Sequence, residues 1–355
     1  MKVTVYAICK NEEKFVDRWY ESMKEADDIY VLDTGSTDNT IEKLKEKGVK
    51  VITKKIKPWR FDIARNESLK LVPLDTDICV CTDLDEVFEK NWRNTLEKAW
   101  KNCNRARYNY NWSLDEHNKP LVNFYIEKIH TRNNYIWKHP VHEVLNYIGS
   151  DKEKIITIDN ITLNHYPDKN KSRSNYLPLL ELSVKEEPED DRNMHYLGRE
   201  YMYYNMNNLA IKTLKKHLSL KSATWKDERC ASYRFIARCY LRKNDKKNTN
   251  KYYDLAIKEA PYLREPYMEK ALFMYEEKKY NEVIFLCNCA LDIEKNPKTY
   301  INEYFSYNET IYDLLSLCYY YKNMNDLALY YIDKALKISP NDKRLLNNKE
   351  YFSSK

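Results

Sequence analysis

The chain has 355 residues, 43% of them hydrophobic and 14% aromatic, which allows two domains with their own cores and excludes a disordered chain. The net charge of +6 is spread thinly, without the dense basic stripe expected of a nucleic-acid-binding protein. No run of about 18 apolar residues occurs, and charges interrupt the N-terminal strand pattern, so we expect no membrane span, no signal peptide and a cytoplasmic location in the cell or its host.

Strand and helix signals alternate over the first 90 residues or so. Apolar β-branched runs predict strands at residues 2–9, 29–32, 49–53 and 78–81. Helical spacing predicts helices at residues 12–26, at about 40–47 and at 62–71. This alternation implies a mostly parallel, Rossmann-like mixed sheet whose ligands bind at the carboxyl ends of the strands, where Asp33 and Asp83 fall.

The middle of the chain is less regular. Aromatic and β-branched runs predict irregular strands at residues 107–112 and 121–126. The stretch 166–170 reads as the end of a catalytic domain, and a helix at about 172–185 is expected to lead onward. We therefore predict an α/β domain at residues 1–175 and a second, all-α domain at residues 176–355.

From about residue 193 the strand signals vanish and a repeat appears. Four units fit the tetratricopeptide pattern of small residues at helix crossings with large aromatics beside them, for example Gly198 with Ala210, Ala237 with Ala256, and Ser316 with Ala328. This spacing predicts a tetratricopeptide-like (TPR-like) α-solenoid. A plain helical bundle without regular stacking is the alternative.

Asp83 and Asp85 follow the fourth predicted strand. Residues two apart on an extended strand end point the same way, so both carboxylates are expected near one point. Such hard oxygen ligands suit Mg²⁺ or Mn²⁺, and the metal would neutralise a diphosphate leaving group. An acidic loop end without a metal is the structural alternative.

Asp33 and Arg65 are further candidates for the nucleotide site. Gly35 permits a tight turn after Asp33, whose carboxylate could accept hydrogen bonds from a base or ribose, while Thr37 or Asp38 caps the next helix. Arg65 lies near a helix start, where it could contact a diphosphate. Its structural alternative is a surface arginine paired with Glu67 or Asp62.

A cluster of histidines and one acid lies further along the chain. The order H-x-x-H-E, ending at His142 and Glu143, differs from the H-E-x-x-H of zinc peptidases and disfavours that class. Glu143 is a candidate general base for an acceptor hydroxyl or thiol, and His165 a candidate third metal ligand. Either histidine could instead be a buried, hydrogen-bonded core residue.

Two residue types narrow the function classes. Nine cysteines without a C-x-x-C pair predict reduced, buried thiols and no structural zinc site built on cysteine. With only four glycines, neither a dinucleotide fingerprint nor a P-loop can be written, and no G-x-S-x-G elbow is present. Dinucleotide-dependent oxidoreductases and P-loop kinases are therefore disfavoured.

Taken together, the chain resembles family 2 glycosyltransferases of the GT-A fold, in particular bacterial-type members with a C-terminal tetratricopeptide region. Six motifs arrive in the family's order within about residues 2–170: residues 10–13 (KNEE), 33–38 (DTGSTD), 64–67 (ARNE), 83–86 (DLDE), 141–143 (VHE) and 164–166 (NHY). The low glycine content and the segment 54–59 depart from the family pattern, which affects the donor loops.

The resemblance implies a metal-bridged nucleotide-diphosphate sugar, with a UDP-sugar expected, and inversion at the anomeric carbon by direct displacement. It places Asn11 and Glu12 under the nucleotide, Asp33 at the nucleoside and Arg65 near the donor. Asp83 would touch ribose or metal, and Asp85 would bind the metal. His142 and Glu143 match a family motif whose role it leaves less defined.

The acceptor is expected to be a hydroxyl or thiol on a protein, peptide or glycan, because similar two-part enzymes include peptide S-glycosyltransferases. The repeats would bind that acceptor or form a homodimer. Two other functions are considered. A non-catalytic TPR adaptor would show a broken D-x-D or a lost Arg65, and a nucleotidyltransferase would carry a Gly-rich basic phosphate loop.

Overall fold

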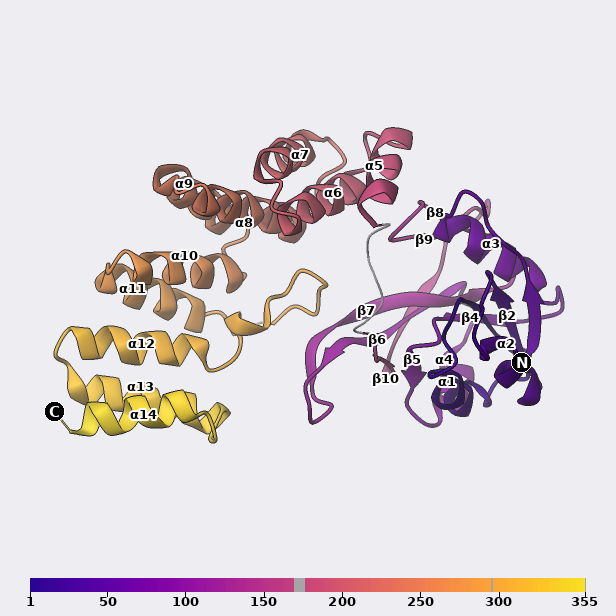
Figure 1. The fold of residues 1–355 in the computed structure, drawn as a ribbon, viewed down its shortest axis with the longest axis horizontal. Coiled ribbons are helices and arrows are strands. Elements are labelled where there is room, and N and C mark those ends of the chain that lie inside the picture. Colours follow the sequence, from indigo (N-terminus) through magenta and orange to yellow (C-terminus); the bar gives the residue numbers. More distant parts are fainter. Residues whose placement is uncertain (169–175, 295, 355) are drawn as a thin grey trace. The chain divides into compact units, whose positions relative to one another are not determined.

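The computed structural model describes residues 1–168, 176–294 and 296–354, and it divides into two compact units (Figure 1). The first contains Met1–Glu186 together with Lys298–Tyr300, and the second contains Glu187–Pro297 and Ile301–Lys355. The domain boundary predicted at residue 175, and the start of the helix predicted at 172–185, lie outside the described residues.

The first unit begins with the predicted alternation of strands and helices, and the structure confirms it. Its elements are β1 (Val3–Cys9), α1 (Val16–Met23), β2 (Asp28–Asp33), α2 (Thr40–Glu46), β3 (Lys50–Thr53), α3 (Phe61–Leu71) and β4 (Ile78–Thr82). β1 is buried along its whole length, as expected of a central parallel strand with both faces covered.

The rest of the first unit contains mainly antiparallel strand pairs, and β6, β7 and β10 are its long strands. Its elements are β5 (Glu86–Phe88), α4 (Trp92–Ala99), β6 (Arg105–Leu114), β7 (Pro120–Thr131), β8 (Tyr135–Lys138), β9 (Val144–Tyr147), β10 (Ile155–His165) and α5 (Tyr176–Glu186). β6 and β7 contain the strands predicted for this region and extend beyond them, and register shifts between them confirm their irregularity.

One mixed sheet organises the unit, in the order β3-β2-β1-β4-β7-β6-β10-β5. β3, β2, β1 and β4 run parallel, and β7 joins β4 antiparallel. Helices α1, α2 and α4 bury Trp19, Leu44 and Leu96 in the core on one face. On the other face, α3 and the separate β8–β9 hairpin supply Leu69 and Trp137 to a second core.

Helix α1 starts later than the sequence predicts. The helical pattern begins at residue 12, whereas the helix begins at Val16. Asn11 has a positive φ of 55°, and the Glu12 amide donates to Thr40 Oγ1 at 2.8 Å. The hydrogen bond to Thr40, a residue distant in the sequence, and the positive φ of Asn11 hold residues 11–15 in a turn. The local sequence pattern contains no sign of this turn.

The second unit is built of consecutive antiparallel helix pairs, as the repeat predicts (Figure 1). Its elements are α6 (Asp191–Tyr203), α7 (Asn207–Ser219), α8 (Lys226–Arg242), α9 (Lys246–Glu259), α10 (Glu265–Glu276), α11 (Tyr280–Leu291), the 3-10 helix η1 (Tyr304–Ser306), α12 (Thr310–Tyr321), α13 (Asn325–Ile338) and α14 (Lys343–Ser353). A Cβ on Gly198 would lie 2.6 Å from Leu214 Cδ2, so the small residue at this crossing is required. The regular pairing confirms the α-solenoid over the plain bundle.

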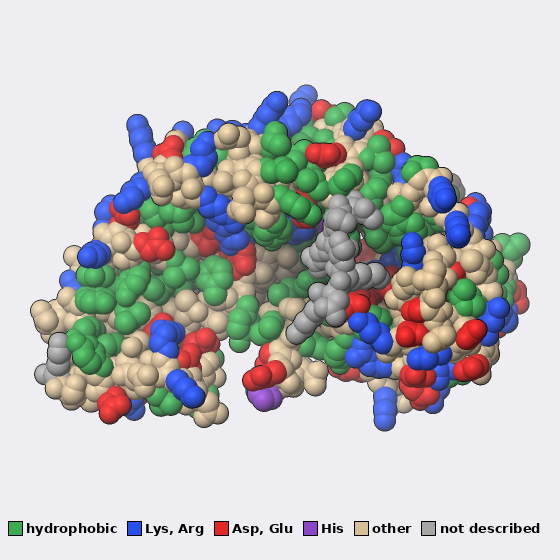
Figure 2. All heavy atoms as spheres, in the orientation of Figure 1, with side chains coloured by type: hydrophobic (Ala, Val, Ile, Leu, Met, Phe, Trp, Pro, Cys, Tyr) green, Lys and Arg blue, Asp and Glu red, His purple; other side chains and the backbone are tan. Residues whose placement is uncertain are grey.

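The cysteine side chains lie mostly in the protein interior, as the composition predicts. All nine cysteines are free, and all but the partly exposed Cys289 are buried. None of the helices in the described part of the chain has the length and apolar character needed to cross a bilayer. Hydrophobic side chains gather over α11 and α12 in Figure 2, where Phe285 and Tyr321 are among the exposed residues.

Candidate active site

The site lies at the carboxyl edge of the parallel strands. β1 lies between β2 and β4, so Cys9, Asp33 and Asp83 reach the same edge from three adjacent strands. This edge is where an open α/β sheet binds ligands. The sequence-based placement of Asp33 and Asp83 is therefore confirmed.

Asp33 organises the loop after β2. Its carboxylate is fully buried and accepts the Gly35 amide at 3.0 Å and the Ser36 amide at 3.1 Å. Gly35 has φ +114°, which a residue with a side chain rarely adopts, so glycine is required there. Asp38 accepts the Thr40 amide at the start of α2. The N-cap position of α2 is Asn39, whose side chain makes no cap hydrogen bond, so Asp38 satisfies the Thr40 amide from the residue before the cap. Asp33 shapes the turn that follows β2.

Asn11 and Glu12 come next to this loop, as their motif order implies. Asn11 Oδ1 accepts the Thr37 amide at 2.7 Å, and the Asn11 amide donates to Ser36 Oγ at 2.9 Å. Glu12 is buried. The two residues therefore tie the end of β1 to the end of β2 and fix the floor of this corner of the sheet.

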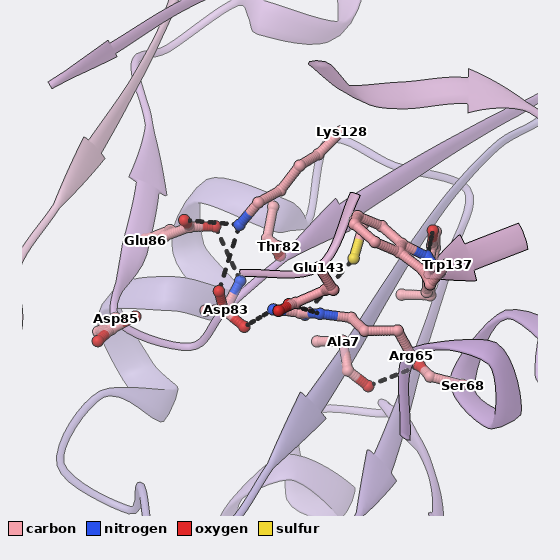
Figure 3. A network of polar contacts seen from close by, with 12 residues as sticks. Ala7, Arg65, Ser68, Thr82, Asp83, Asp85, Glu86, Lys128, Trp137 and Glu143 are labelled. Atoms are coloured by element: carbon pink, nitrogen blue, oxygen red, sulfur yellow. Dashed lines mark hydrogen bonds and ion pairs between the residues drawn. The ribbon is translucent and has the colours of Figure 1, made fainter. Parts of the chain in front are cut away.

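Arg65 is a buried residue, so the surface alternative is wrong. Only 3% of its side chain is exposed, and its guanidinium donates to Asp83 Oδ1 at 2.6 Å and to Glu143 Oε1 at 3.0 Å. Asp62 is paired with Arg60, and Glu67 with Lys54 and Lys70. Figure 3 shows Arg65 between the two carboxylates. It thereby links the D-x-D segment to the H-E segment, far apart in sequence.

Lys128 is a site residue that the sequence analysis missed. Its ammonium lies 3.3 Å from Asp83 Oδ2 and 3.0 Å from Glu86 Oε1 (Figure 3). Glu86 Oε1 also accepts the Tyr110 hydroxyl at 2.8 Å. The one available signal was a lysine within the apolar run of β7, which reads equally well as a solvent-facing position.

The charges in this cluster shift one another's pKa values. Burial alone would raise the pKa of the Asp83 carboxyl, but Arg65 and Lys128 hold it well below its ordinary value. Burial raises the pKa of Glu86, and repulsion from Asp83 and Asp85 adds to that effect. Burial opposes the charge of Lys128, yet Glu86 and Asp83 raise its pKa well above the ordinary value. Asp83 is therefore held as an anion.

Asp83 and Asp85 do not point the same way, so that part of the prediction is wrong. The segment is a turn, closed by the Glu86 amide donating to the Asp83 carbonyl at 3.1 Å, and strand alternation does not apply to it. Asp85 points away from Asp83 in Figure 3. It lies instead beside His165, with Asp85 Oδ2 3.4 Å from His165 Nε2.

His165 is oriented by two contacts on β6. Its ring stacks on Trp112 at 4.6 Å, and Nδ1 lies 2.9 Å from the Trp112 carbonyl, to which it donates. Burial opposes protonation, but the Asp85 carboxylate raises the pKa of His165 above its ordinary value. With Nδ1–H bound to a carbonyl, a neutral ring presents the Nε2 lone pair toward Asp85, which is the second-shell arrangement of metal-ligating histidines.

The donor set fits a divalent cation beside Asp85. One carboxylate oxygen and one imidazole nitrogen lie together, and this mixed pair suits Mn²⁺ better than Mg²⁺, which takes oxygen ligands. Asp83 is not part of this pair, because its carboxylate is ion-paired with Arg65 and Lys128. Within the described residues, Asp83, Asp85 and His165 therefore do not form a group of three metal ligands.

His142 and Glu143 lie in the turn between β8 and β9. His139 and His142 both have positive φ, and the Pro140 carbonyl accepts the Phe61 amide at 2.9 Å, which fixes the turn against the start of α3. The His142 ring meets Tyr176 edge-on at 5.7 Å. Glu143 is thereby presented to Arg65, while His142 faces α5.

The mostly parallel mixed sheet of the first unit agrees with the fold class predicted for it from the sequence. Residues 4–148 match the sequence profile described as Glycosyl transferase family 2.

Relatives at the sequence level are distant. The chain is 29% identical over 108 residues to an uncharacterized glycosyltransferase of Rickettsia bellii, covering 30% of this chain and 35% of that protein. An uncharacterized glycosyltransferase of Rickettsia typhi is 30% identical over 108 residues, covering 30% and 36%. The chain thus spans roughly a third of the length of these relatives.

Among solved structures, a thermophilic TPR protein of Thermus thermophilus is similar with a TM-score of 0.34 and 20% identity, over 50% of this chain and 87% of that one. The repeat architecture itself rests on the helix pairing described above.

Proposed function

We propose that the first unit is a metal-dependent inverting glycosyltransferase that moves a sugar from a nucleoside-diphosphate donor, UDP-linked, to an acceptor hydroxyl or thiol. The observation that carries the proposal is the convergence of Asp85 and His165, 3.4 Å apart, beside the Arg65–Asp83 pair at the carboxyl edge of the sheet. The family match over residues 4–148 supports the reaction class.

The donor would lie on the loops after β1 and β2. The Asp33 turn and Asn11 hold the backbone there by side-chain hydrogen bonds, so this surface is rigid before the nucleotide arrives. A bound Mn²⁺ or Mg²⁺ would be held by Asp85 and His165, with Asp83 nearby, and would offset the charge of the leaving diphosphate.

Glu143 is the proposed general base. Its Oε1 accepts from Arg65 Nε, which fixes the direction of the carboxylate. The acceptor oxygen or sulfur forms its bond to the anomeric carbon as the bond to the nucleoside diphosphate breaks on the opposite side, and Glu143 takes the acceptor's proton. Arg65 holds Asp83 and Glu143 at once, so it positions both the donor side and the acceptor side of the reaction.

The repeats are proposed to bind the acceptor, a protein, peptide or glycan, since stacked helix pairs offer an extended surface. The exposed Phe285 and Tyr321 give part of this surface an apolar character, which would equally serve a homodimer. Size-exclusion chromatography of the full chain decides between the two: a monomer at high concentration contradicts dimerisation through the repeats.

A panel of nucleotide sugars tests the proposal. The full chain is incubated with Mn²⁺ and each donor, and release of the nucleoside diphosphate is measured. We expect turnover of one donor class, with the cognate donor also raising the melting temperature by mass action. No nucleotide binding and no turnover with any donor would favour the adaptor alternative.

Asp75 and Asp85 provide a matched pair of variants. Asp85→Asn removes the carboxylate charge at the carboxyl end of β4, whereas Asp75→Asn removes one near the amino end of the same strand, on the opposite edge of the sheet. We expect Asp85→Asn to abolish Mn²⁺-dependent turnover and Asp75→Asn to retain it. Equal activity in both variants would contradict the assignment of Asp85.

A further inference from the structure

The helical unit contains a second cluster of metal-ligand side chains, remote in sequence from the glycosyltransferase motifs. His195 of α6 and His217 of α7 are fully buried, and Glu228 of α8 is 3% exposed. One ligand atom from each residue lies within 4.8 Å of those of the other two. Three different helices thus direct two imidazoles and a carboxylate toward one region of the core.

One pair of atoms in this cluster has the spacing of two ligands around a metal. His217 Nε2 lies 3.3 Å from Glu228 Oε1, yet that nitrogen makes no hydrogen bond among the described residues. Two atoms each about 2.0 Å from a tetrahedral Zn²⁺ are about 3.3 Å apart. His195 Nε2, also completely buried, likewise has no hydrogen-bond partner in the described part of the chain. Buried polar atoms of this kind require an explanation, and a shared cation provides one.

A single serine orients both rings. Ser232 Oγ lies 2.8 Å from His195 Nδ1 and 2.9 Å from His217 Nδ1, and it sits one helical turn after Glu228 on α8. A serine oxygen can accept a hydrogen bond from each ring, which leaves both Nε2 atoms as lone-pair donors. Orientation of a ligating histidine through its other nitrogen is the usual second shell of a metal site.

We propose that His195, His217 and Glu228 bind one zinc-class divalent cation in the core of the helical unit. Two imidazoles and one carboxylate suit Zn²⁺, and water would complete the tetrahedron. The ion would join α6, α7 and α8, the first helix pair and the start of the next, so its role is to stabilise the beginning of the solenoid. The inference rests on no part of the proposed glycosyl transfer.

The test uses the full chain with Asp85→Asn, so that the proposed catalytic cation site does not contribute. After chelation and removal of the chelator, Zn²⁺ is titrated calorimetrically, bound zinc is counted by elemental analysis, and Co²⁺ is used as a spectroscopic probe. We expect one Zn²⁺ per chain, a tetrahedral Co²⁺ absorption band, and a rise in melting temperature on adding Zn²⁺.

Two variants and one control locate the ion. In the same background, His217→Gln removes a ligand and is expected to weaken Zn²⁺ binding at least about 10-fold and to abolish the Co²⁺ band. Ser232→Ala keeps all three ligands but removes the hydroxyl that orients both imidazole rings, and it is expected to weaken Zn²⁺ binding about 10-fold or more. This variant replaces His217→Gln in the test if His217→Gln does not fold. His117→Gln, in the exposed turn between β6 and β7, is expected to change nothing. Absence of stoichiometric Zn²⁺, or equal binding in all the variants that fold, would overturn the proposal.

Discussion

Replacing Lys128 by methionine removes the ammonium group that lies between the Asp83 and Glu86 carboxylates. The side chain is 16% exposed and makes ion pairs of 3.3 Å and 3.0 Å with them. Methionine retains most of the length of the side chain, so the change is mainly one of charge. The variant therefore isolates the electrostatic part of the site's stability.

The size of the expected loss in folding stability depends on the partners that Asp83 and Glu86 keep. Removing one partner from a buried ion pair costs about 3–5 kcal/mol. Asp83 keeps its bond to Arg65, whereas the hydrogen bonds that Glu86 keeps within the described residues come from neutral groups, the Tyr110 hydroxyl and the Asp83 amide. We therefore expect a loss near the lower end, about 3 kcal/mol at pH 8.

The loss should depend on pH. Burial already raises the pKa of Glu86, and without Lys128 that pKa rises further. Between the ordinary pKa and the raised one, the folded chain holds a proton that the unfolded chain has lost, so stability falls as pH rises through this window. The deficit of Lys128→Met relative to the unchanged chain should thus be small near pH 5 and grow toward pH 8.

Urea unfolding followed by tryptophan fluorescence measures this effect. Of the seven tryptophans, only Trp225 lies outside the first unit, so the signal reports mainly on that unit. Lys70→Met, at an exposed lysine on α3, is the matched control and should be near neutral at both pH values. A deficit of equal size at pH 5 and pH 8, or none at pH 8, would refute the electrostatic reasoning.

Two further predictions follow from single contacts. Gly198→Ala should destabilise the helical unit by about 1–3 kcal/mol, because the new methyl would overlap Leu214. Thermal unfolding followed by circular dichroism measures this loss of stability. An unchanged melting temperature would show that α6 and α7 can separate without cost. The affinity of Asp85 and His165 for Mn²⁺ should rise as the pH rises through the raised pKa of His165, since only the neutral ring binds metal. Calorimetric titration with Mn²⁺ at pH 6 and pH 8 measures this affinity. Equal affinities at the two pH values would exclude His165 as a ligand.

Much of the first unit could be predicted from local pattern. Continuous apolar runs define the four parallel strands, because a central strand such as β1 is buried on both faces and admits few polar residues. The start of α1 could not be predicted, since it depends on the bond between the Glu12 amide and Thr40, a contact across the sheet's edge. Local helical spacing contains no information about such a bond.

For the site residues, too, part of the arrangement could be predicted from the sequence and part could not. Motif order brings Arg65 and Asp83 to one region, but the sequence cannot say that Arg65 is buried and bound to Glu143 as well. The direction of Asp85 could not be predicted, because strand alternation stops where β4 ends at Thr82. Lys128 was missed because a lone lysine in a strand reads as solvent-facing until its carboxylate partners are placed in space.

Binding of manganese and UDP tests the central claim most directly. A crystal of the full chain grown with both should place Mn²⁺ against Asp85 and His165, with the diphosphate on the metal and the nucleoside on the loop formed by Asp33. A crystal that holds UDP elsewhere, or that leaves the Asp85–His165 pair without metal at saturating Mn²⁺, would contradict the account.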